Sequence, residues 1–289
     1  MKRKELQKID RSISLLKSFG SKEPIEVAYS GGKDSDVILQ LVKEAGIPYK
    51  AYYKNTTIDP PGTIKHCLEN NVEIKRPQKT FFHLIEEAGF PNIHYRFCCN
   101  VLKEYKILDK VVIGVRKSES VARNKRYNEP TECRYYGKKI PQNHIEAIYP
   151  ILDWTDEDVV DFINDRKIKL HPLYYRSDGT IDPSRRLGCM CCPLQYEKKR
   201  QRAFAQHPQM IRAYLRAGQK YLDTHPNHKR AQIYNNAYEW LVRDLFFRYN
   251  EDWNNFINVP IFGRTDCKRT LEEFFNIKLD GISKKSRYT

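Results

Sequence analysis

The first half of the chain alternates between apolar positions spaced as in helices and short β-favouring runs. Residues 4–18 have apolar side chains at spacings of three and four, which predicts an amphipathic helix that packs as a cover on the next elements of the chain. Strands are predicted at 24–29, 49–53, 72–74 and 111–116. Helices are predicted between them, from 36 to near Gly46, from Gly62 to about Asn70, and from 80 to 88. This alternation predicts a parallel sheet with helices on both faces.

The second half has a different pattern. Residues 124–146 are polar and are expected to form a mobile flap or insertion. Thr155 or Asp156 is expected to cap a helix whose first turn is acidic. From about residue 197 the pattern is helical and shows no strand alternation. We therefore predict an α/β domain over 1–195 and a helical region over 196–289.

The loop between the first strand and its helix carries the clearest chemical signal. It reads Ser-Gly-Gly-Lys-Asp-Ser at residues 30–35. A glycine pair allows a tight turn with exposed N–H groups, Ser30 and Ser35 add donors, and the helix directs its positive end at the same place. A strand-to-helix turn that merely needs glycine is the alternative. The pattern indicates a phosphate-binding loop at the carboxyl edge of the sheet, where ligands of such sheets collect.

Charge and hydropathy narrow the class of protein. Fifty-one basic and thirty-six acidic residues give a net charge of +15, which attracts polyanions, although a basic soluble protein with a phosphate substrate explains part of the excess. No apolar run reaches the length of about eighteen residues that a membrane span needs. We expect a cytoplasmic protein. The C-terminal region interleaves basic and aromatic residues, which suits a polynucleotide but equally a core of aromatics with solvated charges.

Five of the eight cysteines lie in two clusters. Cys98 and Cys99 stand at the start of a predicted helix, which lowers thiol pKa and favours the thiolate that binds metal, and buried structural cysteines are the alternative. Cys189 and Cys192 form a Cys-x-x-Cys pair, a metal-ligand spacing. Four thiolates suit a [4Fe–4S] cluster and equally zinc. Cys191 is a spare thiol that could replace Cys192 or carry sulfur.

Several of these segments resemble one family. The string at 30–35 resembles the pyrophosphate-binding loop of the PP-loop ATP pyrophosphatases, the superfamily that includes the phosphoadenosine phosphosulfate (PAPS) reductase family. Arg-x-Cys-Cys-x-x-Leu-Lys at 96–103 and Gly-x-Arg-x-x-Glu-Ser-x-x-Arg at 114–123 resemble further elements of that family, as does the segment around Trp154. The resemblance covers about residues 24–195. It implies a Rossmann-like α/β fold of the adenine nucleotide alpha hydrolase-like type.

The resemblance also implies roles for particular residues. Ser30, Gly31, Gly32 and Ser35 would bind pyrophosphate, Lys33 would neutralise charge, and Asp34 would help hold Mg²⁺ near the β and γ phosphates of ATP. Gly114, Arg116 and Arg123 would contribute to the nucleotide and substrate pocket, where guanidinium groups clamp phosphate or sulfate, although surface arginines are the default for either residue alone. Cys98, Cys99, Cys189 and Cys192 resemble the cluster-binding set of iron–sulfur sulfonucleotide reductases.

The intact loop indicates which activity to expect. Members that keep it resemble enzymes that cleave ATP to AMP and pyrophosphate, whereas reductases have a degraded loop and a C-terminal Glu-Cys-Gly-Leu-His that this chain lacks. Cys267 is the cysteine that comes nearest to matching that motif, and it has none of the motif's neighbouring residues. We therefore expect an ATP pyrophosphatase that adenylates an acceptor for sulfur transfer, with DNA or tRNA and a sulfur-donor protein as partners. A sulfonucleotide reductase, and a nucleotide-sensing nucleic-acid-binding module with structural zinc, are the alternatives.

Overall fold

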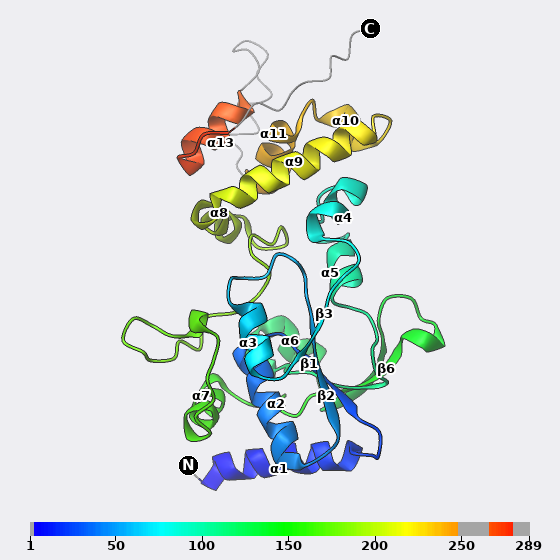
Figure 1. Cartoon of the computed structure of the whole chain (residues 1–289), viewed down its shortest axis with the longest axis vertical. Coiled ribbons are helices and arrows are strands. Elements are labelled where there is room, and N and C mark those ends of the chain that lie inside the picture. The colour runs from blue at the N-terminus through cyan, green and yellow to red at the C-terminus, as the bar shows by residue number, and fades with distance from the viewer. Residues whose placement is uncertain (1–2, 248–265, 280–289) are drawn as a thin grey trace. The chain divides into compact units, whose positions relative to one another are not determined.

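The computed structural model describes residues 3–247 and 266–279 (Figure 1). Contacts divide the chain into two compact units. We call the first, residues 1–77 and 99–189, the sheet unit, and the second, residues 78–98 and 190–289, the helical unit. The chain passes from the sheet unit to the helical unit for the second time between Cys189 and Met190, close to the boundary predicted at 195. Residues 78–98 differ from the expectation, because they group with the C-terminal helices and not with the sheet.

A six-stranded sheet organises the sheet unit, in the order β3-β2-β1-β4-β6-β5. Its strands are β1 (Ile25–Tyr29), β2 (Tyr49–Lys54), β3 (Glu73–Lys75), β4 (Lys110–Val112), β5 (Thr131–Tyr135) and β6 (His144–Ile148). Neighbouring strands are parallel except β5, which runs antiparallel to β6 at the edge. The predicted α/β fold, with a mostly parallel sheet, is thus confirmed. The segment 124–146 was expected to form a mobile flap or an insertion. A mobile flap is wrong for 131–135 and 144–146, which pair as β5 and β6 at the edge of the sheet, and an insertion stays a prediction.

Two apolar clusters pack against the sheet, and helices contribute to the larger of them. The helices of this part of the chain are α1 (Arg3–Phe19), α2 (Lys33–Ala45), α3 (Thr63–Glu69), α5 (Phe97–Leu102), α6 (Val121–Arg126) and α7 (Asp156–Asp165). The larger cluster joins α1, α2 and α7 to β1 residues such as Val27. The smaller one contains Val111 and Ala147, whose chain neighbours Val112 and Ile148 belong to the larger cluster. Since side chains alternate along a strand, the two clusters lie on opposite faces.

Helix α1 packs as the predicted cover. Ile9 and Leu16 are buried and Ile13 is partly buried against the larger cluster, whereas Leu6 is 46% exposed. Helix α7 is tied to α1 through its capping box. Thr155 Oγ1 accepts a hydrogen bond from the Asp158 N–H at 3.2 Å, and the Asp158 carboxylate accepts one from the Thr155 N–H at 2.7 Å and an ion pair from Lys8. Thr155 is therefore the cap that the sequence left open between two residues.

Asp158→Asn should lower the free energy of unfolding by about 1 kcal/mol near neutral pH. Partial burial raises the pKa of Asp158, but hydrogen bonds from Lys8 and Thr155 outweigh it, so the pKa lies below its ordinary 3.8. A depressed pKa means that this contribution is present above that ordinary value and is lost as pH falls through the folded-state pKa. Urea titrations at neutral and at acid pH check this. The difference from wild type should shrink in acid, and the exposed Asp161→Asn on the same helix should change little; an Asp158→Asn effect independent of pH would contradict the ion pair.

The helical unit is built around α9 (Pro208–Thr224). Its other described helices are α4 (Phe81–Ala88), α8 (Glu197–Gln206), α10 (Lys229–Ile233), α11 (Ala237–Trp240) followed by a π-helical turn (Leu241–Phe246), and α13 (Cys267–Phe275). Helices α4 and α9 pack closely. A Cβ at Gly218 of α9 would meet the Phe90 ring at 2.6 Å, so glycine permits this approach.

Most of the described aromatic residues of this unit are core residues. Tyr221, Tyr234, Tyr238 and Trp240 are all buried. Arg200 is buried too, and its guanidinium donates to the carbonyls of Pro193, Gln195 and Leu245. These residues therefore belong to the core alternative and not to a polynucleotide surface. Within residues 3–247 and 266–279, every helix is too short or too polar to cross a lipid bilayer.

Candidate nucleotide site

The predicted phosphate loop lies at the switch point of the sheet. Strand β1 has β2 on one side, reached through α2, and β4 on the other. The loop at 30–35 follows β1, and the segment from Ile113 to Glu119 follows β4, so both start from the carboxyl ends of adjacent parallel strands. Ligands of open parallel sheets bind in the crevice at such a point. All residues of this site lie in the sheet unit.

Both glycines of the loop have a structural reason. Gly31 has a φ of +75°, in the left-handed region that glycine adopts without strain. A Cβ on it would also lie 3.0 Å from Leu187 Cδ2 and 3.2 Å from Thr63 Cγ2. A Cβ on Gly32 would lie 3.1 Å from the Tyr174 hydroxyl. Side chains on either glycine would therefore strain the turn or push away the segments that surround it.

The hydroxyls of the loop are arranged around the start of α2. Ser35 Oγ donates to the Gly32 carbonyl at 2.6 Å, and Ser30 Oγ lies 3.3 Å from Ser35 Oγ. The main-chain N–H of Gly32 points to Ser30 Oγ at 3.4 Å. Gly32 is the N-cap of α2, so the positive end of the helix dipole falls at the same place. Backbone dipole and hydroxyls thus converge as an anion-binding turn requires.

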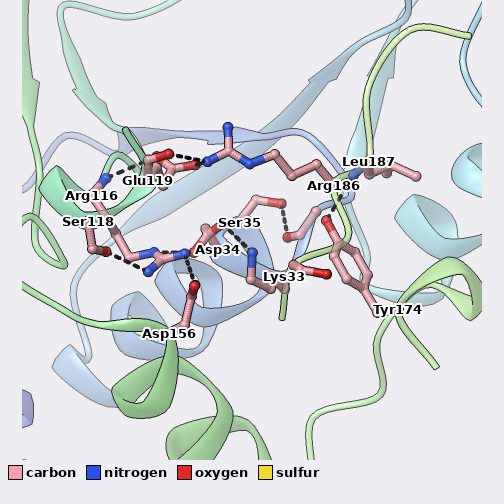
Figure 2. Close-up of polar contacts among 12 residues, drawn as sticks. Lys33, Asp34, Ser35, Arg116, Ser118, Glu119, Asp156, Tyr174, Arg186 and Leu187 are labelled. Atoms are coloured by element: carbon pink, nitrogen blue, oxygen red, sulfur yellow. Dashed lines mark hydrogen bonds and ion pairs between the residues drawn. The ribbon is translucent and has the colours of Figure 1, made fainter. Parts of the chain in front are cut away.

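Lys33 and Asp34 of the loop form a chain of ion pairs with Arg116 (Figure 2). Lys33 is 2% exposed, and its Nζ lies 3.4 Å from Asp34 Oδ2. Asp34 Oδ1 accepts a hydrogen bond from Arg116 Nε at 2.6 Å. Each oxygen of the Asp34 carboxylate therefore faces a cation. The carboxylate is oriented by partners on both sides.

The guanidinium of Arg116 donates hydrogen bonds to three side chains. Besides Asp34 it donates to Ser118 Oγ at 2.9 Å and to Asp156 Oδ1 at 2.7 Å, and it is 1% exposed. The sequence predicted an arginine emerging from the strand end to clamp phosphate. In the structure this arginine contacts Asp34 and links the loop to the first turn of α7, and its role toward phosphate stays a prediction.

Gly114 acts through close packing. A Cβ at this position would lie 3.0 Å from the Asp34 carbonyl oxygen and 3.1 Å from its carbon. These are main-chain atoms that cannot rotate away. Glycine therefore lets the segment after β4 approach the first turn of α2, which brings Arg116 within reach of Asp34.

A second group of charges is centred on Glu119. Its carboxylate pairs with Arg123, and Arg186 Nη2 lies 3.5 Å from Oε1 and donates to the Glu119 carbonyl at 2.9 Å. Removal from water lowers the pKa of Arg123, and repulsion from Arg186 lowers it further. Two guanidinium groups therefore share one carboxylate close to the loop.

A buried hydrogen-bond network of Tyr29, Asp36 and His66 lies next to the phosphate loop. Asp36 accepts a hydrogen bond from the Tyr29 hydroxyl, and His66 Nε2 lies 3.0 and 3.1 Å from its two carboxylate oxygens. Burial raises the pKa of Asp36, although the bonds from His66 and Tyr29 oppose that shift. The network ties α2, β1 and α3 together directly behind the phosphate loop.

The four predicted cluster cysteines divide between the two units. Cys99 and Cys189 belong to the sheet unit, and Cys98 and Cys192 to the helical unit. Cys189 Sγ lies 3.4 Å from Thr56 Oγ1. Partial removal from water lowers the pKa of Lys103, but Cys189 and Asp59 raise it and the net shift is upward; Cys99 acts on the same ammonium. Across the described parts of the chain, no group of three or more His, Cys, Asp or Glu is placed to hold a metal ion.

Cys191 is unsuited to the role of spare ligand or sulfur carrier. It is 1% exposed, and its thiol points to the Ala203 carbonyl at 3.4 Å. Its own carbonyl accepts a hydrogen bond from the Tyr214 hydroxyl at 2.9 Å. Burial raises the pKa of the Cys191 thiol to about 12. These contacts make it part of the core of the helical unit.

The contacts of some site residues could not be predicted from the sequence. Asp156 was predicted only as a helix cap, whereas its carboxylate accepts a hydrogen bond from Arg116. Tyr174 and Arg186 come from the segment between α7 and the Cys-x-x-Cys pair, which carried no chemical assignment. The Arg-Arg pair before Leu187 is the one feature that could have drawn attention to that segment. Their contacts with residues far away in the chain are visible only after folding.

Comparisons with known proteins place this site in a family. An uncharacterized protein of Methanocaldococcus jannaschii is 26% identical over 220 residues, which are 71% of this chain and 43% of that protein. An uncharacterized 37.8 kDa protein of Escherichia phage 186 is 31% identical over 157 residues, 48% of this chain and 43% of that protein. Sulfate adenylyltransferase subunit 2 of Bacteroides thetaiotaomicron is 23% identical over 186 residues, 53% of this chain and 61% of that subunit. The chain thus spans about half the length of these relatives.

Solved structures are similar at low sequence identity. PAPS reductase from Candida auris, in a phosphate complex, is 15% identical, with a TM-score of 0.42 over 63% of this chain and 95% of that one. FMN adenylyltransferase from Candida glabrata, in complex with FMN and an ATP analogue, is also 15% identical, with a TM-score of 0.41 over 62% of each chain. The family model of the phosphoadenosine phosphosulfate reductase domain matches residues 24–195, which hold the whole phosphate loop and all six strands. The chain belongs to the PAPS reductase family, within the adenine nucleotide alpha hydrolase-like superfamily.

Proposed function

We propose that this protein is an ATP pyrophosphatase that cleaves ATP between the α and β phosphates and transfers AMP to an acceptor. The observation that carries the proposal is the complete phosphate loop, with Lys33 buried beside Asp34 and Asp34 oriented by Arg116. Family membership supports binding of an adenine nucleotide.

The loop would hold the β and γ phosphates, and the chain's own residues would manage their charge. The N–H groups at the start of α2 and the hydroxyls of Ser30 and Ser35 donate to phosphate oxygens. Lys33 offsets charge that builds on the departing pyrophosphate. Asp34 is the carboxylate that would help hold Mg²⁺, an ion that binds through one or two carboxylates plus phosphate oxygens and would polarise the phosphoryl group. The acceptor oxygen would form a bond to the α phosphorus. The bond between the α phosphorus and the oxygen that bridges to the β phosphate would break, and pyrophosphate would leave with that oxygen.

The reaction would serve sulfur transfer to a nucleic acid. An adenylated acceptor carries AMP as a leaving group, which a sulfur nucleophile from a donor protein displaces. The charge of +15 supports a polyanionic acceptor such as DNA or tRNA. In the helical unit, Tyr196 is 90% exposed, and Lys198, Lys199 and Arg202 lie on the exposed side of α8. Basic side chains beside an exposed aromatic ring suit a polynucleotide backbone and its bases.

For Cys98, Cys99, Cys189 and Cys192 we propose metal binding, with a [4Fe–4S] cluster as the first candidate and zinc as the second. Their number and spacing support the proposal. The described residues contain no three-ligand group, so we derive no reaction step through a metal there. Elemental analysis of anaerobically purified protein decides it. Iron with acid-labile sulfide supports the cluster, stoichiometric zinc supports the alternative, and neither metal rejects both.

The proposed activity is tested by the products formed from ATP. Wild type with Mg²⁺ should release AMP and pyrophosphate, and Ser35→Ala should slow this by about tenfold or more, because it removes a donor next to the phosphates. Ser18→Ala is the matched control, since that hydroxyl is exposed on α1 and bonds only to its own helix. Formation of ADP and phosphate would refute the proposal.

The two alternative functions predict different results. A sulfonucleotide reductase would release sulfite from adenosine phosphosulfate in the presence of thioredoxin. A nucleotide-sensing module would bind ATP and nucleic acid without forming AMP, and would contain zinc. Sulfite release without any ATP cleavage would favour the first, and tight ATP binding without turnover in the presence of oligonucleotides would favour the second.

A further inference from the structure

The hydroxyl of Tyr174 borders the phosphate loop (Figure 2). A Cβ on Gly32 would lie 3.1 Å from Tyr174 Oη and 3.3 Å from Ser30 Oγ. Ser30 Oγ lies 3.3 Å from Ser35 Oγ. Because Gly32 has no side chain, the room beside it stays open between the hydroxyls of Tyr174 and Ser30. The edge of the loop therefore carries a third hydroxyl group, from a residue to which the sequence analysis gave no role.

The segment around Tyr174 holds its ring in place. Tyr174 is 2% exposed and belongs to the larger apolar cluster. Its carbonyl accepts a hydrogen bond from the Asp182 N–H at 2.8 Å. Arg185 donates to the carbonyls of Leu173 and Tyr175 at 3.0 and 2.9 Å, which ties the chain on both sides of Tyr174 to the stretch that leads back to the loop. The hydroxyl is therefore positioned before any ligand arrives.

Main-chain groups occupy the acceptor side of this hydroxyl. The Leu187 N–H donates to Tyr174 Oη at 3.1 Å. The main chain of Lys33, the first residue of α2, also forms a hydrogen bond with it. A phenol accepts hydrogen bonds through its oxygen and has one hydrogen to donate. With two N–H groups on the oxygen, the hydrogen is what Tyr174 can still offer to a ligand.

The surroundings of Tyr174 keep its phenol protonated. Removal from water raises the pKa of Tyr174 above its ordinary 10.0, and the nearby charges of Asp34 and Asp36 raise it further. The main-chain bonds from Leu187 and Lys33 oppose the shift without reversing it. Near neutral pH the group is thus a neutral O–H donor, which is the form that can bind a phosphate oxygen.

We propose that Tyr174 is a further pyrophosphate ligand, whose hydroxyl donates its hydrogen to a phosphate oxygen held by the loop next to Ser30. A donor that is already in position when the anion binds needs no reorganisation, so its hydrogen bond adds fully to affinity. The assignment rests on the proposed function for the identity of the ligand. It needs binding of pyrophosphate and does not need turnover.

Calorimetric titration of the full chain with inorganic pyrophosphate and Mg²⁺ tests this contact. Tyr174→Phe keeps the ring and removes only the hydroxyl, so the affinity for pyrophosphate should fall by about tenfold or more. Tyr175→Phe is the matched control. The Tyr175 hydroxyl also accepts a main-chain N–H, from Leu170 at 3.0 Å, and its ring packs against the same cluster. Its loss should change the affinity by less than about twofold.

Difluorotyrosine at position 174 separates a ligand contact from a structural one. Its phenol is more acidic, so it donates a stronger hydrogen bond and accepts a weaker one. If the hydroxyl donates to pyrophosphate, affinity should rise near neutral pH. It should then fall as pH is raised through the lowered phenol pKa, because a phenolate has no hydrogen to donate and repels the anion. A hydroxyl that only accepts N–H bonds predicts the reverse, since a phenolate is the stronger acceptor.

Wild type over the same pH range is the control for this experiment. The charged and titratable groups around the ring are the same in both proteins, and they are Tyr29, Lys33, Asp34, Asp36 and His171. A pH dependence that appears only with difluorotyrosine therefore belongs to position 174. This protein keeps both the ring and the hydroxyl, so it gives a result even if Tyr174→Phe unfolds.

Three outcomes would overturn the assignment. Unchanged pyrophosphate affinity in folded Tyr174→Phe would show that the hydroxyl makes no contact. Tighter binding would show that it competes with phosphate for the Lys33 N–H. Stronger binding of pyrophosphate by the difluorotyrosine protein at alkaline pH would show that it acts only as an acceptor. Cleavage of ATP to ADP would reject the proposed function and leave the pyrophosphate result intact.

Discussion

Asp34→Asn should slow formation of AMP and pyrophosphate by about 10²–10³-fold, the range found when one preorganised group that stabilises the transition state is removed from an active site. Asparagine keeps the shape of the side chain but removes the charge that would hold Mg²⁺. It also leaves Lys33 and Arg116 without the carboxylate between them. Initial rates at saturating ATP and Mg²⁺, followed by chromatography of the nucleotides, measure the effect.

A matched carboxylate provides the control for this variant. Asp153 is 76% exposed and pairs with Lys117 on the surface, so Asp153→Asn should keep nearly full activity. Thermal melts with and without ATP show whether Asp34→Asn still folds. If that variant is folded and retains activity within about threefold of wild type, Asp34 has no part in catalysis and the assignment of the loop fails.

Arg116→Met should destabilise the sheet unit by about 3–5 kcal/mol, the usual cost of removing one partner from a buried ion pair. Arg116 is 1% exposed and holds Asp34, Ser118 and Asp156 together. Its loss leaves the Asp34 carboxylate in a poorly solvated place with one weak partner. Urea denaturation followed by far-UV circular dichroism measures the change.

The partners of Arg116 should differ in importance. The Asp156 side chain is 50% exposed, so Asp156→Ala should cost less than about 1 kcal/mol, because water replaces the lost partner. Arg116→Lys should not restore stability, since one ammonium cannot serve three acceptors in different directions. Equal stability losses in Arg116→Met and Asp156→Ala would show that the arginine is not the centre of the network.

The phosphate loop could be predicted because its chemistry is contiguous. The glycine pair, the two serines and the helix that follows them lie within a few residues, and local backbone preferences place them without help from the rest of the chain. The same holds for Thr155, whose capping box closes within three residues. The alternation of strands and helices was likewise sufficient for the α/β class.

The edge of the sheet was mispredicted for a physical reason. The segment 124–146 is polar, and an edge strand that is exposed on one side needs little apolar alternation to pair. Strand β5 is held by backbone hydrogen bonds to β6, which the side-chain pattern does not report. Helix α4 was predicted correctly as a helix, but its assignment to the nucleotide-binding domain depended on chain order, whereas packing against α9 decides its unit.

The amino-acid sequence alone determined the fold class, the family and the predicted phosphate loop. Each depends on short contiguous segments whose local geometry changes little with the rest of the chain. Only the tertiary structure decided that Arg116 serves Asp34, that Arg186 joins Arg123 at Glu119, and that Cys191 is a core residue. Those assignments depend on side chains that are tens of residues apart in the chain and meet only when strands and helices pack. A pattern of residue types records which groups are available, and folding selects which of them come within hydrogen-bonding distance.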